Sequence, residues 1–183
     1  MPGNIKLLNA LITLLADKPL SRISVRDLLR TASLSKSTFY RLFNDKNDFL
    51  LWVMHYLLNQ FTNQSYANMT PKTFYLNYLG HYATNRRAFK AFVIEDHWTD
   101  FEQQLKTVGI EIYRQVFQPF ILQPQVKTLL ATYIVNADVA VAINWLKTDD
   151  SRTIDQLATE MARLTIAVLA VYNIDFQEIL RHN

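Results

Sequence analysis

The residues best suited to chemistry in this sequence form one short polar run. Within residues 35–41, hydroxyl groups alternate with cations, and the members are Ser35, Lys36, Ser37, Thr38, Tyr40 and Arg41. Hydroxyls and cations hydrogen-bond to phosphates and to base edges in the major groove of double-stranded DNA. A polar run of this kind can equally be a solvated helix face, so composition alone leaves DNA binding and a structural role open.

Two short helices and a turn are predicted to position this run. Ser24 can cap the first helix, because Asp27 stands three residues later, at the spacing of a capping box. Residues 32–34 form the turn, and Ser35 can cap the second helix, which continues to about Arg41. Helices this short bury little surface alone, so their apolar positions must pack on the helices that precede and follow them.

This region resembles the DNA-binding signature of the TetR/AcrR family, over roughly residues 4–60. The matching positions are Ser24, Val25, Arg26, Asp27, Leu28, Ala32, Leu34, Ser35, Lys36, Thr38, Phe39, Tyr40, Phe43, Lys46, Phe49 and Leu50. The resemblance implies that Ser24, Tyr40 and Lys46 contact phosphates. It also implies that the operator is read by Lys36, Ser37, Thr38 and Arg41.

Three positions depart from the family pattern. Ser33 stands where the family usually has Gly, and a left-handed backbone there costs a non-Gly residue about 1–2 kcal/mol. Leu29 stands where a small Ala is common, and Leu42 where an aromatic residue or His is common. We expect the fold to hold, whereas Leu42 removes one possible phosphate contact and leaves the DNA affinity open.

Glycine and proline are scarce, which favours an all-α fold. The 183 residues include three Gly and five Pro, and apolar residues recur at spacings of three and four rather than two. We predict an N-terminal three-helix helix-turn-helix DNA-binding domain over residues 1–46. A larger helical effector-binding and dimerisation domain is predicted over residues 47–183.

Charge and cysteine content agree with a cytoplasmic DNA-binding protein. Residues 1–65 hold eight Lys and Arg against four Asp and Glu, whereas residues 66–183 hold eleven against twelve. A basic segment attracts a polyanion. The absence of Cys excludes disulfides and thiolate metal sites. The apolar run 129–146 is short and interrupted by polar residues, so we expect no membrane span.

Residues 138–164 resemble the last two helices of the same family, which implies a homodimer through a four-helix bundle. Apolar stripes and alanines at helical spacing allow such helices to approach closely. The predicted interface consists of Ala140, Ile143, Leu157, Met161, Leu164 and Val168. The alternative is that both helices only fill the core of one subunit.

The middle of the chain is rich in large amphipathic rings, which line small-molecule cavities but also fill cores. An effector cavity is predicted from Tyr82, Phe89, Phe92, His97, Trp98, Tyr113, Phe117, Tyr133 and Asn136. Its ligand should be mostly apolar or aromatic, because no buried cation is expected to pair with an anion.

Catalysis is disfavoured. The four His residues show no metal-ligand spacing, and the three isolated Gly residues cannot form a phosphate-binding loop, so we expect no catalytic residues, metal or cofactor. The favoured function is a homodimeric repressor that binds a pseudo-palindromic operator in double-stranded DNA and is released by a small molecule. The alternative is an interaction protein of the same fold, a coactivator or scaffold whose larger domain binds a protein.

Overall fold

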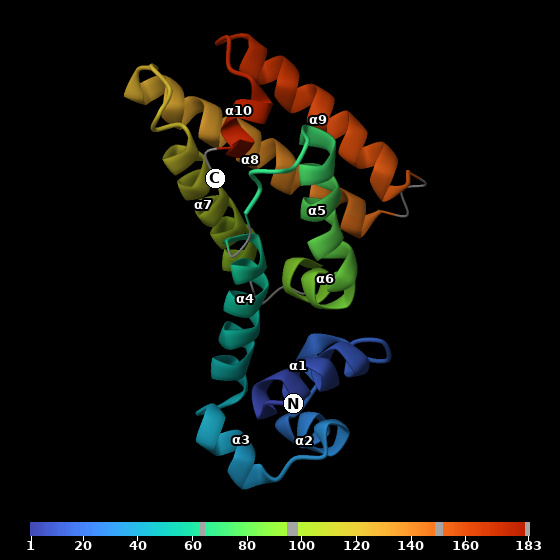
Figure 1. Cartoon of the computed structure of the whole chain (residues 1–183). Coiled ribbons are helices and arrows are strands. Elements are labelled where there is room, and N and C mark those ends of the chain that lie inside the picture. Colours follow the sequence, from blue (N-terminus) through green and yellow to red (C-terminus); the bar gives the residue numbers. More distant parts are fainter. Residues whose placement is uncertain (63–64, 95–98, 149–151, 182–183) are drawn as a thin grey trace. The chain divides into compact units, whose positions relative to one another are not determined.

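The computed structural model describes residues 1–62, 65–94, 99–148 and 152–181, and these form helices and connecting turns without a strand (Figure 1). The predicted all-α class is confirmed. The helices are α1 (Gly3–Leu14), η1 (Leu20–Arg22), α2 (Val25–Ala32), α3 (Lys36–Leu42), α4 (Lys46–Thr62), α5 (Pro71–Thr84), α6 (Arg86–Ile94), α7 (Thr99–Val116), α8 (Pro124–Lys147), α9 (Ile154–Ala170) and α10 (Phe176–Arg181). The short helices η1 and α10 were not predicted.

The chain divides into two compact units. Unit 1 contains residues 1–59 and 85–101, and unit 2 contains residues 60–84 and 102–183. The chain passes between the units within α4, between α5 and α6, and within α7, and the functional boundary after residue 46 stays a prediction. Each unit therefore draws on two separate stretches of chain.

Local sequence signals begin several of the helices, including the predicted cap at Ser24. Ser24 forms a complete capping box at α2, and Thr153 forms one at α9 with Gln156. Proline begins α5 and α8, where the missing N–H costs no helical hydrogen bond. These caps satisfy backbone donors that the first helical turn otherwise leaves unpaired.

The core of unit 1 is aromatic where α3 meets α4. Phe39 and Phe49 are fully buried, with their ring centroids 6.2 Å apart, and Phe43 lies 5.2 Å from Phe49. Leu7 and Leu11 of α1 are also fully buried. Burying each of these side chains contributes roughly 1.5–3 kcal/mol, so the core rather than α3 itself keeps this short helix folded.

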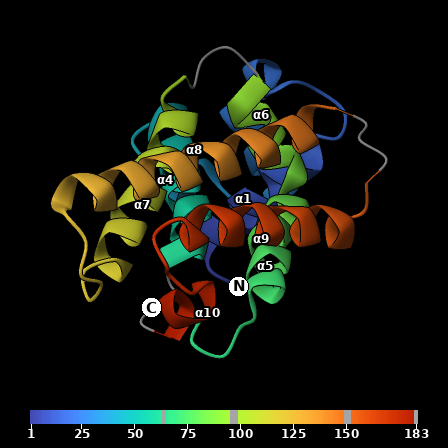
Figure 2. The same cartoon turned by 90° about the horizontal axis from the view of Figure 1, so that it is seen from above.

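Unit 2 is built around α5, α8 and α9. Helices α8 and α9 run side by side in opposite directions, and α5 packs on α9 (Figures 1 and 2). Gly109 of α7 faces α8 so closely that an added Cβ would lie 2.8 Å from Val135 Cγ1. A larger residue at this position would force the Val135 side chain to shift, so Gly109 allows α7 to pack closely against the same core.

Helix α8 is apolar along most of its length. Among the described residues it is the helix that meets the length and hydropathy criteria of a membrane span. The core helix of a soluble protein meets the same criteria, and ten residues of α8 are buried in the protomer. This finding is therefore weak evidence for a span.

Candidate nucleic-acid interface

The turn between α2 and α3 has the strained geometry expected from its sequence. Ser33 adopts the left-handed conformation, with φ 53° and ψ 48°. The N–H groups of Ser33 and Leu34 donate to the carbonyls of Arg30 and Leu29 at 3.3 and 3.0 Å. These bonds close the end of α2 and turn the chain into α3, so the strain at Ser33 serves the helix-turn-helix geometry.

The first turn of α3 gathers three hydroxyl groups at the surface. Ser35 Oγ accepts a hydrogen bond from the Thr38 N–H at 3.2 Å. It also lies 2.9 Å from both Ser37 Oγ and Thr38 Oγ1. The caps of α2 and α3 thus place a cluster of donors and acceptors on an exposed helix end, as DNA contacts require.

The outward face of α3 adds cations to these hydroxyls. Lys36 Nζ lies 5.7 Å above the ring of Tyr40, which is half exposed. The Tyr40 ring packs edge-on against buried Phe39 at 5.4 Å, so the core fixes the ring that supports the cation. Arg41 is exposed one residue further along.

Two of the residues expected to touch phosphates also have structural partners. Lys46 Nζ donates to the Leu20 carbonyl at 2.8 Å and so ties the start of α4 to η1. Ser24 Oγ donates to Asp27 Oδ2 at 2.7 Å. Hydrogen bonds from Lys18 and Ser24 hold the pKa of Asp27 well below its usual range, which keeps the capping carboxylate ionised.

Comparison with known families decides the identity of this arrangement. Residues 7–53 match the family described as bacterial regulatory proteins, tetR family, and residues 69–167 match a transcriptional regulator C-terminal region. The chain belongs to the TetR family. It is therefore a DNA-binding transcription regulator, and regulators of this family bind DNA operators, usually act as dimers and are generally not enzymes.

Solved structures share the fold of this TetR-family chain. One is the dihydroxyacetone kinase operon activator DhaS, with a TM-score of 0.77, 17% identity, and coverage of 92% of this chain and 97% of DhaS. Another is a TetR transcriptional regulator from Streptococcus agalactiae 2603V, with a TM-score of 0.63, 18% identity, and coverage of 89% and 93%. Sequence comparison with curated proteins finds no match.

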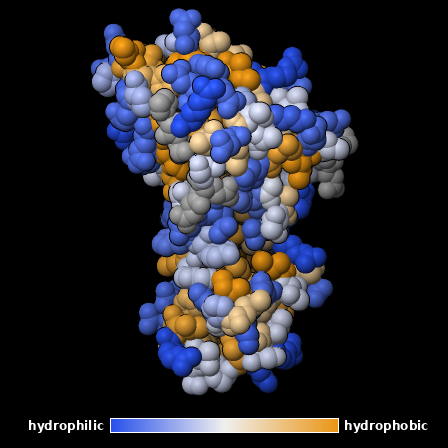
Figure 3. All heavy atoms as spheres, viewed as in Figure 1, coloured by the Kyte–Doolittle hydropathy of each residue, from blue (hydrophilic) through white to orange (hydrophobic). Residues whose placement is uncertain are grey.

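The predicted dimer residues of this TetR-family chain divide between core and surface. Ile143, Leu157 and Met161 are at most 5% exposed and belong to the protomer core. Leu164 is 64% exposed, and Ala140 is also at the surface. The reason for the difference is helical phase, because one apolar stripe faces inward and a second faces outward. Hydrophobic side chains that reach the surface are visible among hydrophilic ones in Figure 3.

The outward stripe of α8 and α9 includes residues that the sequence analysis did not assign to an interface. Leu129 and Tyr133 of α8 are 57% and 59% exposed, and Val171, just after α9, is 75% exposed. Val168 is half-buried between the two stripes.

The predicted effector residues are divided between the two units. Phe89 and Phe92 lie in unit 1 and pack on Phe101, whereas Tyr82, Tyr113 and Phe117 are buried in unit 2. Tyr133 faces outward, and the side-chain amide of Asn136 donates to the Thr132 carbonyl of its own helix. His97 and Trp98 lie outside the described residues.

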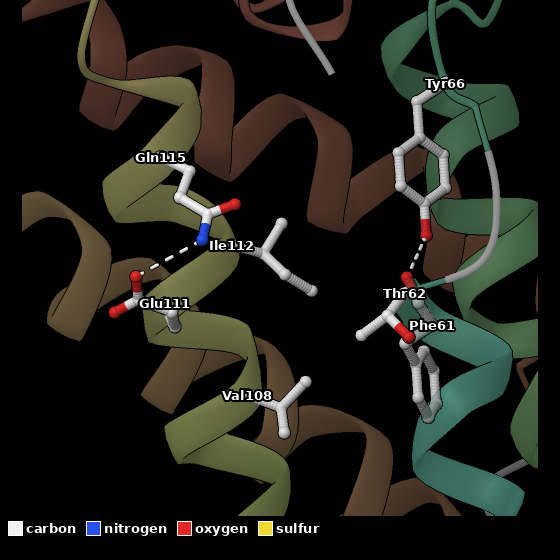
Figure 4. A pocket seen from close by; sticks show the side chains of 7 residues that line it. All are labelled: Phe61, Thr62, Tyr66, Val108, Glu111, Ile112 and Gln115. Atoms are coloured by element: carbon white, nitrogen blue, oxygen red, sulfur yellow. Dashed lines mark hydrogen bonds between the residues drawn. The ribbon is translucent and has the colours of Figure 1, made fainter.

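A pocket in unit 2 was not anticipated from the sequence. Its volume is about 300 Å³, and it lies between the end of α4 and the following loop on one side and α7 on the other (Figure 4). The lining residues are Phe61, Thr62, Tyr66, Val108, Glu111, Ile112 and Gln115. No motif marks these positions, because Phe61, Thr62 and Tyr66 meet α7 only in the folded unit.

A buried polar cluster in the core of unit 2 was also missed. The Tyr75 hydroxyl of α5 lies 2.9 and 3.1 Å from the carboxyl oxygens of Asp138 on α8, and 2.6 Å from Thr165 Oγ1 on α9. Burial raises the pKa of Asp138 to about 8, opposed by the hydrogen bond from Tyr75. The available signal was a lone carboxylate within an otherwise apolar stretch of helix, which usually marks a functional or tightly bonded group.

No residues of the described ranges form a metal site, as judged by groups of three or more His, Asp or Glu.

Proposed function

We propose that this TetR-family regulator is a homodimeric repressor that binds a pseudo-palindromic operator and leaves it when a small molecule binds unit 2. The observation that carries the DNA-reading part is the surface of α3. Capped hydroxyls, Lys36 and Arg41 lie there on a helix anchored by Phe39, and the helix is part of the segment that matches the family's N-terminal region.

The roles of the α3 residues follow from their reach. Arg41 and Lys36 are long exposed cations that can donate to base acceptors, and Ser37 and Thr38 offer hydroxyls on the same face. Ser24, Tyr40 and Lys46 are assigned to phosphates. Lys46 and Ser24 then have two roles, because each also stabilises the helix-turn-helix through a hydrogen bond within the protein.

The dimer is proposed to form through the outward stripe of α8 and α9. Leu164, Tyr133 and Leu129 are each more than half exposed, an unusual state for three large apolar side chains on neighbouring helices. Ala140 and Val168 are retained from the predicted interface. Two copies of this pair of helices would bury the stripe in a four-helix bundle.

Release by a ligand requires that the ligand bind one conformation better than the other. Equal affinity for the DNA-bound and free forms would leave operator occupancy unchanged. Unit 2 offers the pocket beside α7 for such a ligand.

A second candidate is an activator whose larger unit binds a protein. The similarity to a dihydroxyacetone kinase operon activator favours it, and the outward stripe could serve a different chain as well as a second copy.

Two measurements test these proposals. The full chain is incubated with a pool of random duplexes, and bound sequences are recovered and read. A regulator of the proposed kind enriches one pseudo-palindromic sequence, whereas recovery of unrelated sequences contradicts it. Transcription from a promoter carrying the enriched site then separates the candidates, because a repressor lowers the transcript level and an activator raises it.

A further inference from the structure

The surface of α3 has two flanks, one on each side of its outward face. Buried Phe39 and Phe43 define the inward side of the helix, and at about 100° per residue Arg41 lies on the opposite side. A helix about 10–12 Å across fills a major groove about 12 Å wide, and this groove has one sugar–phosphate backbone along each edge. When Arg41 points at the bases, each flank of α3 therefore faces the phosphates of a different strand.

The first flank carries polar groups that suit a phosphate. Lys36 and Tyr40 lie there one turn apart, with the Lys36 ammonium group 5.7 Å from the centre of the Tyr40 ring. Tyr40 is half exposed, so its hydroxyl is accessible to a phosphate oxygen. The strand on this side of the groove can therefore be contacted by α3 itself.

The second flank of α3 carries Thr38 and Leu42 and is apolar where it meets α1. A Cβ added to Gly3 would lie 3.1 Å from Leu42 Cδ1 and 3.7 Å from Thr38 Cγ2. The first turn of α1 therefore borders this flank, and Leu42 remains 39% exposed beside it. Because an alkyl side chain cannot pair with a phosphate, a cation for the second strand must come from a neighbouring helix.

Lys6 of α1 supplies a cation next to this second flank. It stands three residues after Gly3, and side chains at this spacing are neighbours on one side of a helix, about 5–6 Å apart. Lys6 is exposed, and its ammonium group has no hydrogen bond or ion pair within the described ranges. The adjoining residues Leu7 and Leu11 are buried in unit 1, so the core fixes the backbone that carries Lys6.

We propose that Lys6 binds an operator phosphate on the strand opposite to the strand that Tyr40 contacts. Both edges of the major groove are then contacted, one from α3 and one from α1, with Arg41 over the bases between them. A phosphate contact carries no sequence information, but it fixes the register in which Arg41 meets the bases. The inference adds a residue to the DNA interface and is independent of repression, dimerisation and effector release.

Removal of the Lys6 charge tests the contact through the salt dependence of DNA binding. The full chain is titrated by fluorescence anisotropy with the duplex recovered from the random pool and with a duplex of scrambled sequence, from about 50 to 200 mM KCl. Lys6→Met should weaken binding to both duplexes about 3- to 10-fold. It should also lower the slope of log affinity against log salt concentration by about 0.9 for each bound subunit. Lys6→Arg keeps the charge and should bind within about twofold of the parent chain.

Lys147→Met is the matched control for net charge. Lys147 is exposed in the last turn of α8, so this variant loses the same charge from unit 2 and leaves unit 1 unchanged. It should keep the salt dependence of the parent chain. An equal fall in slope for Lys6→Met and Lys147→Met, or no fall for Lys6→Met, overturns the proposal.

Single methylphosphonates in the recovered duplex locate the contact on one strand. Each replaces the charge of one phosphate by a neutral group and weakens binding of the parent chain where a cation or hydroxyl contacts that phosphate. In Lys6→Met, one phosphate of each half-site should lose this effect. In Tyr40→Phe, a phosphate on the opposite strand should lose it. A Lys6→Met profile identical to that of the parent chain, or a loss on the same strand as in Tyr40→Phe, overturns the proposal.

Failure of the Lys6 contact can be distinguished from failure of sequence-specific reading. If the random pool yields no preferred sequence, the proposed operator is contradicted, and the salt slope on the scrambled duplex still tests Lys6. If a preferred sequence is recovered and Lys6→Met keeps the slope of the parent chain, the contact is contradicted and operator reading is not.

Discussion

The polar residues of the two units are arranged in opposite ways. In unit 1 the hydroxyls of α3 face outward and bond to residues two or three positions away. In unit 2 the Tyr75 hydroxyl is buried and bonds to residues 63 and 90 positions away. The first arrangement leaves polar atoms accessible to an external partner. The second arrangement buries the polar atoms inside the protein, where a polar group without a hydrogen-bond partner is destabilising.

The exposed polar residues of unit 1 suit recognition of an external partner, whereas the buried polar residues of unit 2 connect its helices to one another. The α3 surface can change its residues with little effect on folding, because its side chains are solvated and its core contacts come from Phe39. The Tyr75 cluster joins α5, α8 and α9 inside the protomer, so a change there acts on the internal packing of unit 2 and not on an exposed surface.

The largest effect is expected where two neighbouring residues of α9 face opposite ways. Leu164→Glu places a charge on the outward stripe and should yield a monomer whose operator affinity falls at least about 100-fold, since two coupled half-sites are needed for tight binding. Thr165→Val changes the inward neighbour and should leave the dimer intact. Sedimentation measures the oligomeric state of each variant, and DNA titration measures its operator affinity. If the Leu164→Glu variant remains dimeric, the dimer interface lies elsewhere.

Substitutions on α3 should affect recognition without unfolding. Arg41→Ala is expected to cost about 1–3 kcal/mol in operator binding and to relax the preference at one base pair. Lys36→Ala should act similarly. Fluorescence anisotropy on a set of single-base operator variants measures both effects.

Lys46→Ala serves as the contrasting variant. It should weaken binding to all duplexes and lower the salt dependence by about one ion, the signature of a lost phosphate contact. Equal losses on every sequence from all three variants contradict the division between base and phosphate contacts.

The buried cluster should make stability depend on pH. Burial raises the folded-state pKa of Asp138 from its ordinary value of 3.8 to about 8, so the folded state retains a proton that the unfolded state releases. Its contribution to stability is fully present below about pH 4 and is lost as the pH rises to 8, by about 1.4 kcal/mol per pH unit. Asp138→Asn should flatten this part of the profile. Denaturant unfolding from pH 5 to 8 measures the slope, and identical slopes in both proteins contradict the assignment.

The smallest effects are expected at the turn and the cap. Ser33→Gly relieves the left-handed conformation and should stabilise unit 1 by about 1 kcal/mol. Ser35→Ala removes the cap of α3 and should destabilise it by about the same amount. Opposite shifts in denaturation midpoint are the expected result, and shifts of one sign for both variants contradict this account of the turn.

Features that depend on contacts between neighbouring residues could be predicted from the sequence, whereas features that depend on contacts between distant residues could not. The Ser24 and Ser35 caps and the left-handed Ser33 involve partners within a few residues, so their spacing in the sequence was sufficient. The pairing of Tyr75 with Asp138 depends on how α5 and α8 meet, and no local pattern contains that information.

The proposed dimer face could be predicted from the sequence only in part. Helical spacing correctly indicated that α8 and α9 are apolar on more than one side, but it could not say which side faces inward. Ile143 and Leu157 therefore belong to the core, while Leu164 lies outside. The phase of a helix is set by its neighbours, and these come from distant parts of the chain.

The most direct test of the central claim is a hydroxyl-radical footprint of the chain on the duplex recovered from the random pool. Two α3 helices of one dimer should protect two patches on the same face of the DNA, about 34–36 Å or a small multiple of one helical turn apart. In the same experiment, at a protein concentration that half-saturates the duplex with the parent chain, Arg41→Ala should weaken both patches together. A single protected patch, or a footprint that Arg41→Ala leaves unchanged, would contradict the claim that paired α3 helices read the operator.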